Sequence, residues 1–258
     1  MKEEDIFNLK TKGYTILRGW VSKEWLSKID RILPKLFSEH KKIREKNNNS
    51  IISEGVAMNV LVSDNTFIDF VQEMIDKGLI DSLEKNYFSD KCILNSFSAL
   101  SNIKSESDLF YKKVHRDIRS YSGKIPLLLN SLVMIDDFTV ENGGTLLLPY
   151  SHLIEKKPTK KFWEENHINI TGKAGDIILW NSNIFHASGI NKTTQIRRGL
   201  PITFSLPYYK QLLDYPRALG YNRKDMFSKE MQQLLGYNST TPLSLNEWYA
   251  PTDKITYK

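Results

Sequence analysis

The chain has 258 residues, 40% of them hydrophobic and 26% charged, which is the composition of an ordinary soluble globular protein with room for a sizeable core. Its formal net charge of +6, from 36 basic and 30 acidic side chains, is spread along the sequence, so we expect mild attraction of anionic small molecules and no nucleic-acid partner. The single cysteine, Cys92, excludes an internal disulfide, and neither a signal peptide nor an apolar run of roughly 20 residues is present, so we expect a cytoplasmic protein without a membrane span.

Helical patterns dominate residues 1–90. Apolar residues recur at helical spacing after Ser22, which is placed to cap that helix, and a second such pattern precedes Asp90. The stretch between them is polar and rich in asparagine, which indicates a loop. The predicted elements are, in chain order, a short helix over Ile6–Leu9, a strand over Gly13–Leu17, a helix from Ser22 to Leu36, a loop over Lys42–Ser53 and a helix over 66–86.

After Asp90 the pattern changes to short apolar runs separated by Gly, Asn, Ser and Pro, which is typical of an all-β core. Eight short strands fit a mainly β fold, a double-stranded β-helix (jelly roll, cupin-like) with flanking helices. We therefore predict a single domain over 1–258, with a helical region 1–90, a jelly-roll core 91–206 and C-terminal helices and loops 207–258. The predicted strands are Cys92–Ala99, Lys113–Asp117, Leu127–Asp136, Thr145–Pro149, Ile168–Thr171, Asp176–Trp180, Phe185–Ala187 and Gln195–Ser205.

His115 and Asp117 lie two residues apart on a predicted strand, where side chains at i and i+2 point to the same face. A second imidazole, from His186 on a distant strand, would complete a set of two histidines and one carboxylate. Such a set holds one face of an octahedral ion, leaves three positions open and is typical of mononuclear non-haem Fe(II) oxygenases. A lone His-x-Asp arises often by chance, so the prediction depends on the combination of all three residues.

Arg197 follows His186 on the last predicted strand. Its guanidinium can bind a carboxylate through two parallel charge-assisted hydrogen bonds, and the Ser188 hydroxyl can supply a third. This pair would suit the distal carboxylate of a dicarboxylic co-substrate, with a surface ion pair as the alternative for Arg197. For Arg198 the ion pair is the favoured interpretation, because adjacent strand residues face opposite ways.

Several stretches resemble the phytanoyl-CoA dioxygenase family of Fe(II)/2-oxoglutarate oxygenases. The resemblance covers most of residues 5–205, is most specific in 115–198 and fades after 206. Tyr150 stands where the family usually has glycine. The matching stretches are the opening Gly13–Leu17, the metal motif His115–Asp117, the central signature Ile135–Gly144 with Leu148–His152, and the block that runs from Gly175-Asp176 through His186–Asn191 to Arg197.

The resemblance implies a set of site residues and three small-molecule cofactors or co-substrates: Fe(II), 2-oxoglutarate and O2. The aromatic residue that some members carry near the start of the central strand is replaced around Leu132. His152 is assigned no metal role, although it directly follows a predicted strand. The implied residues are His115, Asp117 and His186 as metal ligands and catalytic centre, and Arg197, Ser188 and Asn95 as contacts of 2-oxoglutarate, Asn95 being the polar residue on the strand before the metal motif.

The implied activity is that of a 2-oxoglutarate-dependent dioxygenase, which hydroxylates an unactivated C–H bond of a small-molecule or biosynthetic intermediate and releases succinate and CO2. Related halogenases replace the carboxylate ligand by a small residue, so Asp117 favours hydroxylation, while desaturation, epimerisation and ring formation stay open. Two other interpretations are a catalytically inactive jelly-roll binding module and a cupin-type metalloenzyme that does not use 2-oxoglutarate.

No motif specifies the small-molecule substrate, and the protein is expected to be a monomer or a homodimer. Arg116 and Arg119 flank the metal motif. An arginine that faces the mouth of the site would indicate an anionic substrate, and surface pairing is the alternative. We expect selectivity to come from loops. The candidate segments are Lys42–Ala57, Ser101–Lys112 and the tail from Pro207, in which Leu243–Tyr249 either caps the site or contacts a second copy.

Overall fold

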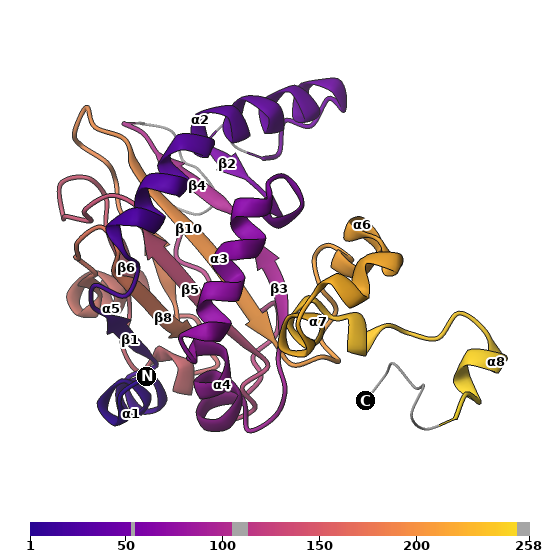
Figure 1. Ribbon diagram of the computed structural model, residues 1–258. Helices are drawn as coiled ribbons and strands as arrows, with labels where there is room; N and C mark the ends of the chain where they lie inside the picture. Colours follow the sequence, from indigo (N-terminus) through magenta and orange to yellow (C-terminus); the bar gives the residue numbers. More distant parts are fainter. Residues whose placement is uncertain (53–54, 105–112, 252–258) are drawn as a thin grey trace.

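The computed structural model describes residues 1–52, 55–104 and 113–251 (Figure 1). The larger of its two antiparallel sheets is built on the long strand Arg197–Ser205, which neighbours three other strands. The strands of this sheet are β1 (Tyr14–Leu17), β2 (Val56–Ala57), β3 (Ile93–Phe97), β4 (Ala99–Asn102), β5 (Leu128–Met134), β8 (Ile177–Asn181) and β10 (Arg197–Ser205). Their order is β1-β8-β5-β10-β4-β2, and β3 pairs with the second half of β10.

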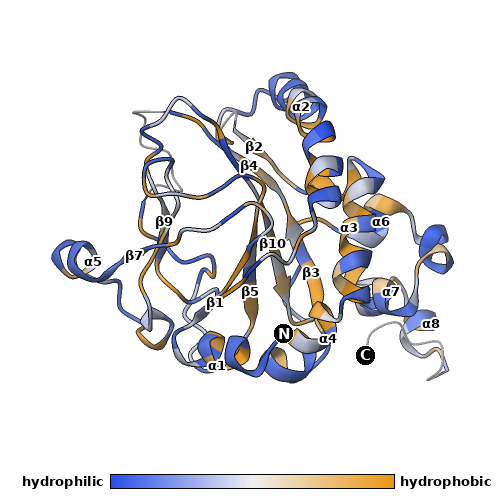
Figure 2. Cartoon of the chain, turned by 60° about the vertical axis from the view of Figure 1, so that its left-hand side comes forward, coloured by the Kyte–Doolittle hydropathy of each residue, from blue (hydrophilic) through white to orange (hydrophobic). Residues whose placement is uncertain are grey.

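A smaller sheet faces the large one from the side opposite the long helices (Figure 2). Its central strand is β6 (Thr145–Leu147), which pairs with β7 (Ile168–Asn169) and with β9 (His186–Ser188). The two facing antiparallel sheets form the double-stranded β-helix that the strand pattern predicts.

Helices cover the outer face of the large sheet and leave its inner face to the small sheet (Figures 1 and 2). No helix among the described residues is both long and apolar enough to cross a bilayer. The helices are α1 (Glu3–Thr11), α2 (Lys23–Lys46), α3 (Asn65–Asp76), α4 (Leu79–Leu83), α5 (Lys160–Asn166), α6 (Tyr215–Leu219), α7 (Lys229–Leu235) and α8 (Leu245–Trp248), with short turns η1 (Val60–Val62), η2 (Glu84–Phe88), η4 (Ser151–Leu153), η5 (Tyr221–Met226) and η6 (Tyr237–Ser239).

The alternation of side chains along β5 and β10 separates the core from a cavity between the sheets. Leu129 and Val133 of β5 and Ile202 of β10 are buried against the helical layer. Their neighbours Asn130 and Thr203 point to the other side and line the cavity. One face of each strand thus anchors it to the helices, and the other face, which includes Asn130 and Thr203, is left for a site.

Two predicted helical boundaries are wrong for local reasons. The predicted loop Lys42–Ser53 begins inside α2, which continues to Lys46, because its Lys, Glu and Arg side chains are good helix formers even without an apolar face. The predicted helix over 66–86 is instead divided at Gly78, which has φ of +70° and so leaves the right-handed helical region. Residues 53–54 lie outside the described residues.

Two predicted strands also differ. The strand expected over Cys92–Ala99 is divided into β3 and β4 at Ser98, whose N–H donates to the carbonyl of Pro201 on β10. Proline has no N–H to return, so the ladder is interrupted there. The strand expected over Lys113–Asp117 is reduced to one isolated β-bridge at His115.

Arg198 connects α2 to the sheet, as the alternating strand pattern predicts for a residue facing away from Arg197. Its Nη2 and Nε atoms donate to the Asp136 carboxylate at 2.7 and 2.9 Å, and Nη1 reaches Asp30 on α2. The two carboxylates raise the pKa of the guanidinium further above its already high value. This partly buried network positions the start of β10, where Arg197 lies.

We expect Arg198→Met to lower the free energy of unfolding by about 1–3 kcal/mol, because it removes charge-assisted hydrogen bonds and leaves Asp136 without them. The matched control is Lys161→Met, which removes an exposed charge whose ion pair with Glu165 spans 4.0 Å and should cost no more than about 0.5 kcal/mol. Urea unfolding of both variants measures the difference, and equal losses would show that the network contributes no more than a surface pair.

Candidate metal centre

Two backbone hydrogen bonds place the candidate ligands His115 and His186 beside each other. The N–H of each residue donates to the carbonyl of the other at 3.0 Å, which makes an isolated antiparallel bridge. His186 begins β9, which is itself paired with β6, so His115 is attached to the small sheet through this bridge. The site is therefore assembled by main-chain pairing between segments far apart in the sequence.

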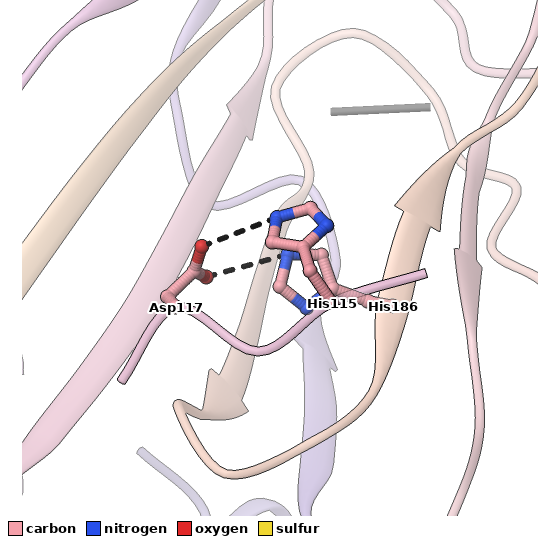
Figure 3. A group of neighbouring side chains, drawn as sticks. All are labelled: His115, Asp117 and His186. Carbon is pink, nitrogen blue, oxygen red and sulfur yellow. Dashed lines mark ion pairs between the residues drawn. The ribbon is translucent and has the colours of Figure 1, made fainter. Parts of the chain in front are cut away.

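The carboxylate of Asp117 faces both imidazoles, which lie beside each other with ring centroids 4.4 Å apart (Figure 3). Its Oδ1 is 3.5 Å from Nε2 of His115, and its Oδ2 is 3.3 Å from Nε2 of His186. One ligand atom from each residue can be chosen so that all three lie within 4.8 Å of one another. The structure thus brings together the three residues that the sequence singles out as metal ligands.

The hydrogen bonds of both imidazoles suit a divalent metal. Nδ1 of His115 lies 2.7 Å from the carbonyl of Lys113, and Nδ1 of His186 lies 3.2 Å from the carbonyl of Ile184. A carbonyl only accepts, so Nδ1 of each ring carries a proton, and in the neutral ring Nε2, which faces Asp117, is left to bind a metal. Metal-binding histidines usually have this arrangement, and two imidazole nitrogens with a carboxylate form a donor set for Fe(II).

Asn130 and Thr203 hold the carboxylate, and the sequence did not single them out. Nδ2 of Asn130 donates to Oδ2 of Asp117 at 2.5 Å, while the Thr203 hydroxyl donates to Oδ1 of the same amide at 2.9 Å. The hydroxyl contact fixes which end of the amide faces Asp117. The available signal was a polar residue inside the apolar run Leu127–Asp136, in a position that alternation places on the cavity side.

Burial and mutual attraction set the charges of the centre. Burial raises the pKa of Asp117, but the two histidines outweigh it, so the pKa falls below its usual value and the carboxylate is ionised. Burial lowers the pKa of His186 by more than Asp117 raises it, which favours a neutral ring. Burial also lowers the pKa of His115, but the hydrogen bond and charge of Asp117 raise it by more, so its net shift is upward.

We expect the affinity for metal to decrease as the pH is lowered through the pKa of His115. A metal binds the neutral imidazole, so protons compete below the pKa of His115, which lies above the ordinary 6.5. We expect the apparent Kd for Mn(II) to be constant at higher pH and to rise about tenfold per pH unit once the pH falls below that pKa. Equilibrium dialysis across the range tests this, and an affinity that stays constant down to pH 6 would contradict it.

The orienting role of Asn130 gives a second prediction. Asn130→Leu has similar volume but removes the donor to Asp117, so we expect the Kd for Mn(II) to rise about 10–100-fold. Ser131→Ala is the matched control, because the Ser131 hydroxyl donates to the carbonyl of Ile202 and not to the site. Dialysis of folded variants measures both, and an unchanged affinity in Asn130→Leu would show that Asp117 does not depend on the amide.

A cavity of about 340 Å³ opens beside the three candidate ligands and reaches Arg197. The Arg197 side chain is buried at 3% exposure, its Nη2 lies 3.2 Å from the Ser188 hydroxyl, and its guanidinium stacks 4.3 Å from the centre of the Phe138 ring. Asn102, which the sequence did not single out, donates to the carbonyl of Gly189 at 3.1 Å and supports the same corner. The structure therefore places the predicted Arg197 and Ser188 together.

Asn95 also lines the cavity, but its amide nitrogen is directed at the chain that follows β10. Nδ2 lies 3.0 Å from the carbonyl of Lys210 and 3.3 Å from the Ser205 hydroxyl, and Leu212 N–H donates to the Asn95 carbonyl. These bonds make segment 206–212 a wall of the cavity, to which Tyr209 and Leu212 contribute side chains. Contact between Asn95 and 2-oxoglutarate stays a prediction.

His152 and the tail segment, both considered in the sequence, are not part of the cavity lining. His152 is buried against Gly13, with its Nε2 3.4 Å from the carbonyl of Lys10. The segment Leu243–Tyr249 is not part of the cavity lining and projects from the body beyond α7 (Figure 1). In the predicted mouth loop Ser101–Lys112, residues 105–112 lie outside the described residues.

A family model described as phytanoyl-CoA dioxygenase matches residues 9–199, a range that contains all three candidate ligands and Arg197.

Comparison with curated proteins gives distant relatives. The Mycobacterium tuberculosis protein Rv1501 is 34% identical over 167 residues, which cover 64% of this chain and 59% of that protein. The dioxygenase olcK of Penicillium canescens is 31% identical over 126 residues, which cover 45% of this chain and 41% of that protein. The chain thus matches about three fifths or less of the length of these relatives.

Comparison with solved structures extends the fold likeness. The Fe-bound structure of EctD from S. alaskensis has a TM-score of 0.65 at 16% identity, with 82% of this chain and 80% of that chain covered. The epimerase SnoN, in complex with Fe3+, alpha ketoglutarate and nogalamycin RO, has a TM-score of 0.58 at 15% identity, with 80% and 83% covered. At such low identity the likeness shows a shared fold.

Proposed function

The chain belongs to the phytanoyl-CoA dioxygenase family, and we propose that it is an Fe(II)/2-oxoglutarate-dependent oxygenase that hydroxylates a C–H bond of a small molecule. The observation that carries this proposal is the set of His115, Asp117 and His186 around one point in a cavity whose far corner holds Arg197. Iron(II) bound there would supply the activation of O2, coupled to conversion of 2-oxoglutarate to succinate and CO2.

The residues of the chain would hold the metal and its co-substrate at a fixed separation. Ser188 lies two residues beyond His186 on β9, a Cα distance of roughly 7 Å in an extended strand, and its hydroxyl meets the Arg197 guanidinium. A five-carbon diacid spans a similar distance. The guanidinium and hydroxyl would bind its distal carboxylate, leaving the 2-oxo acid end at the metal.

Hydroxylation is the proposed outcome because Asp117 occupies the carboxylate position and leaves no vacant place for a halide. SnoN is described as an epimerase, and one EctD structure holds 2-oxoglutarate with 5-hydroxyectoine, so this fold accommodates more than one outcome. In this chain the outcome would depend on which C–H bond the cavity presents to the metal. A product that gains one oxygen atom by mass spectrometry would distinguish hydroxylation from desaturation or epimerisation.

We expect anaerobic addition of Fe(II) and 2-oxoglutarate to the purified protein to produce the weak visible absorption band of the metal chelate. The band should be lost in His186→Ala, because one of the three ligands is removed. A folded wild-type protein without the band would contradict the oxygenase proposal. It would favour an inactive binding module if metal also fails to bind, or a cupin-type enzyme without 2-oxoglutarate if metal binds.

Arg197→Met tests the co-substrate site separately. We expect its Kd for 2-oxoglutarate to rise about 30-fold or more, since losing one partner of a buried charged hydrogen bond costs about 2 kcal/mol or more. Mn(II) affinity, measured by dialysis on the same samples, should stay within about twofold and serves as the control for folding. If 2-oxoglutarate affinity survives the change, the distal carboxylate is bound elsewhere.

A further inference from the structure

Two arginines flank the candidate ligand Asp117, and the structure gives them different roles. Arg116 is committed to the protein frame, because its Nε donates to the carbonyl of Asn183 at 2.7 Å and its Nη1 to the carbonyl of Glu155 at 2.7 Å. The guanidinium also stacks over the Phe185 ring at 4.0 Å. Arg116 therefore anchors the metal motif and is not available to a ligand.

Arg119 lines the cavity that contains the metal centre, and its side chain is exposed to solvent there. Within the described parts of the chain, this side chain makes no hydrogen bond and no ion pair. Its Cα lies at most about 7 Å from that of Asp117, because the two residues are only two positions apart in the chain. A long flexible side chain at this distance can meet a molecule whose other end lies at the metal.

The formal charges of the described cavity lining leave one positive charge uncompensated. Arg119 and Arg197 contribute +2 and Asp117 contributes −1, with the histidines neutral, so the sum is +1. A divalent metal and the dianion of 2-oxoglutarate cancel each other, so the loaded cavity keeps this +1.

Part of the remaining lining is apolar and suited to a carbon skeleton, beside several hydroxyl and amide side chains. Leu128 and Leu132 of β5, with Trp180 of β8, form an apolar surface beside the triad, and Leu212 continues it on segment 206–212. A substrate that fits this surface would have an apolar portion next to the metal and a charged group directed to the exposed arginine.

We propose that the substrate is a small molecule with an apolar carbon segment and an oxyanion, a carboxylate or a phosphate, and that Arg119 binds this oxyanion and thereby decides which C–H bond faces the metal. This deepens the proposed oxygenase function and rests on it. A guanidinium binds either oxyanion through two parallel hydrogen bonds, so one receptor accounts for both chemical classes.

The test is calorimetric titration of Mn(II)- and 2-oxoglutarate-loaded protein, in which no turnover occurs, with hexanoate, hexyl phosphate and hexan-1-ol as probes. We expect one of the two anions to bind at least about tenfold more tightly than the alcohol, with an affinity that falls as salt is raised. Arg119→Met should remove both the preference and the salt dependence, and Arg119→Lys should retain part of each.

The matched control is Lys124→Met, which removes a charge five positions along the chain and outside the cavity lining. It should keep the preference for the anion. The proposal is overturned if Arg119→Met keeps that preference, if Lys124→Met loses it equally, or if neither anion binds better than the alcohol at millimolar concentration.

The proposed function and this inference fail in distinguishable ways. If metal or 2-oxoglutarate does not bind, the oxygenase proposal is contradicted, and the hexanoate titration is repeated on metal-free protein. There, a loss of binding in Arg197→Met with none in Arg119→Met would assign the anion to the buried arginine and reject Arg119. A loss confined to Arg119→Met would keep Arg119 as an anion receptor even without oxygenase chemistry.

Discussion

The candidate metal centre depends on the pair of main-chain hydrogen bonds between His115 and His186. Side chains alone would not hold two imidazoles and a carboxylate together, because Asp117 can attract each ring but cannot set the direction of its lone pair. The bridge fixes both backbones, the carbonyls of Lys113 and Ile184 fix both tautomers, and only then does the carboxylate meet two nitrogens that point at it. The backbone pairing of His115 with His186 thus determines how the two imidazoles are placed for binding a metal.

The large sheet contributes to this centre through alternation. Asn130 and Thr203 face each other on paired strands, and their contact orients the amide that holds Asp117. The opposite faces of the same strands are packed on the helices, and this packing holds the backbone of Asn130 in place. Arg198 fastens the beginning of β10 to α2 and Asp136, which steadies Arg197 on the other face. Polar positions at the site and apolar positions in the core therefore support each other.

Strand periodicity and the family resemblance were sufficient to predict the jelly roll and to choose the three residues that meet in the cavity. The positioning residues were not predictable in the same way. The contact of Asn130 with Thr203 depends on the register of β5 against β10, which no local pattern specifies. The break at Gly78 depends on a left-handed φ inside an otherwise continuous helical pattern. The role of Arg116 depends on the backbone carbonyls of Asn183 and Glu155, which lie far from it in the sequence.

The hydrogen bonds between Asn95 and segment 206–212 attach a wall of the cavity that lies beyond the family match. The family match ends at residue 199, whereas Thr203, Tyr209 and Leu212, which line the cavity, follow it. The part of the wall nearest the outgoing chain is therefore built from sequence outside the shared family region, attached by a few bonds to backbone carbonyls. A change in this segment would therefore reshape one wall of the cavity and leave the three candidate ligands and Arg197 in place.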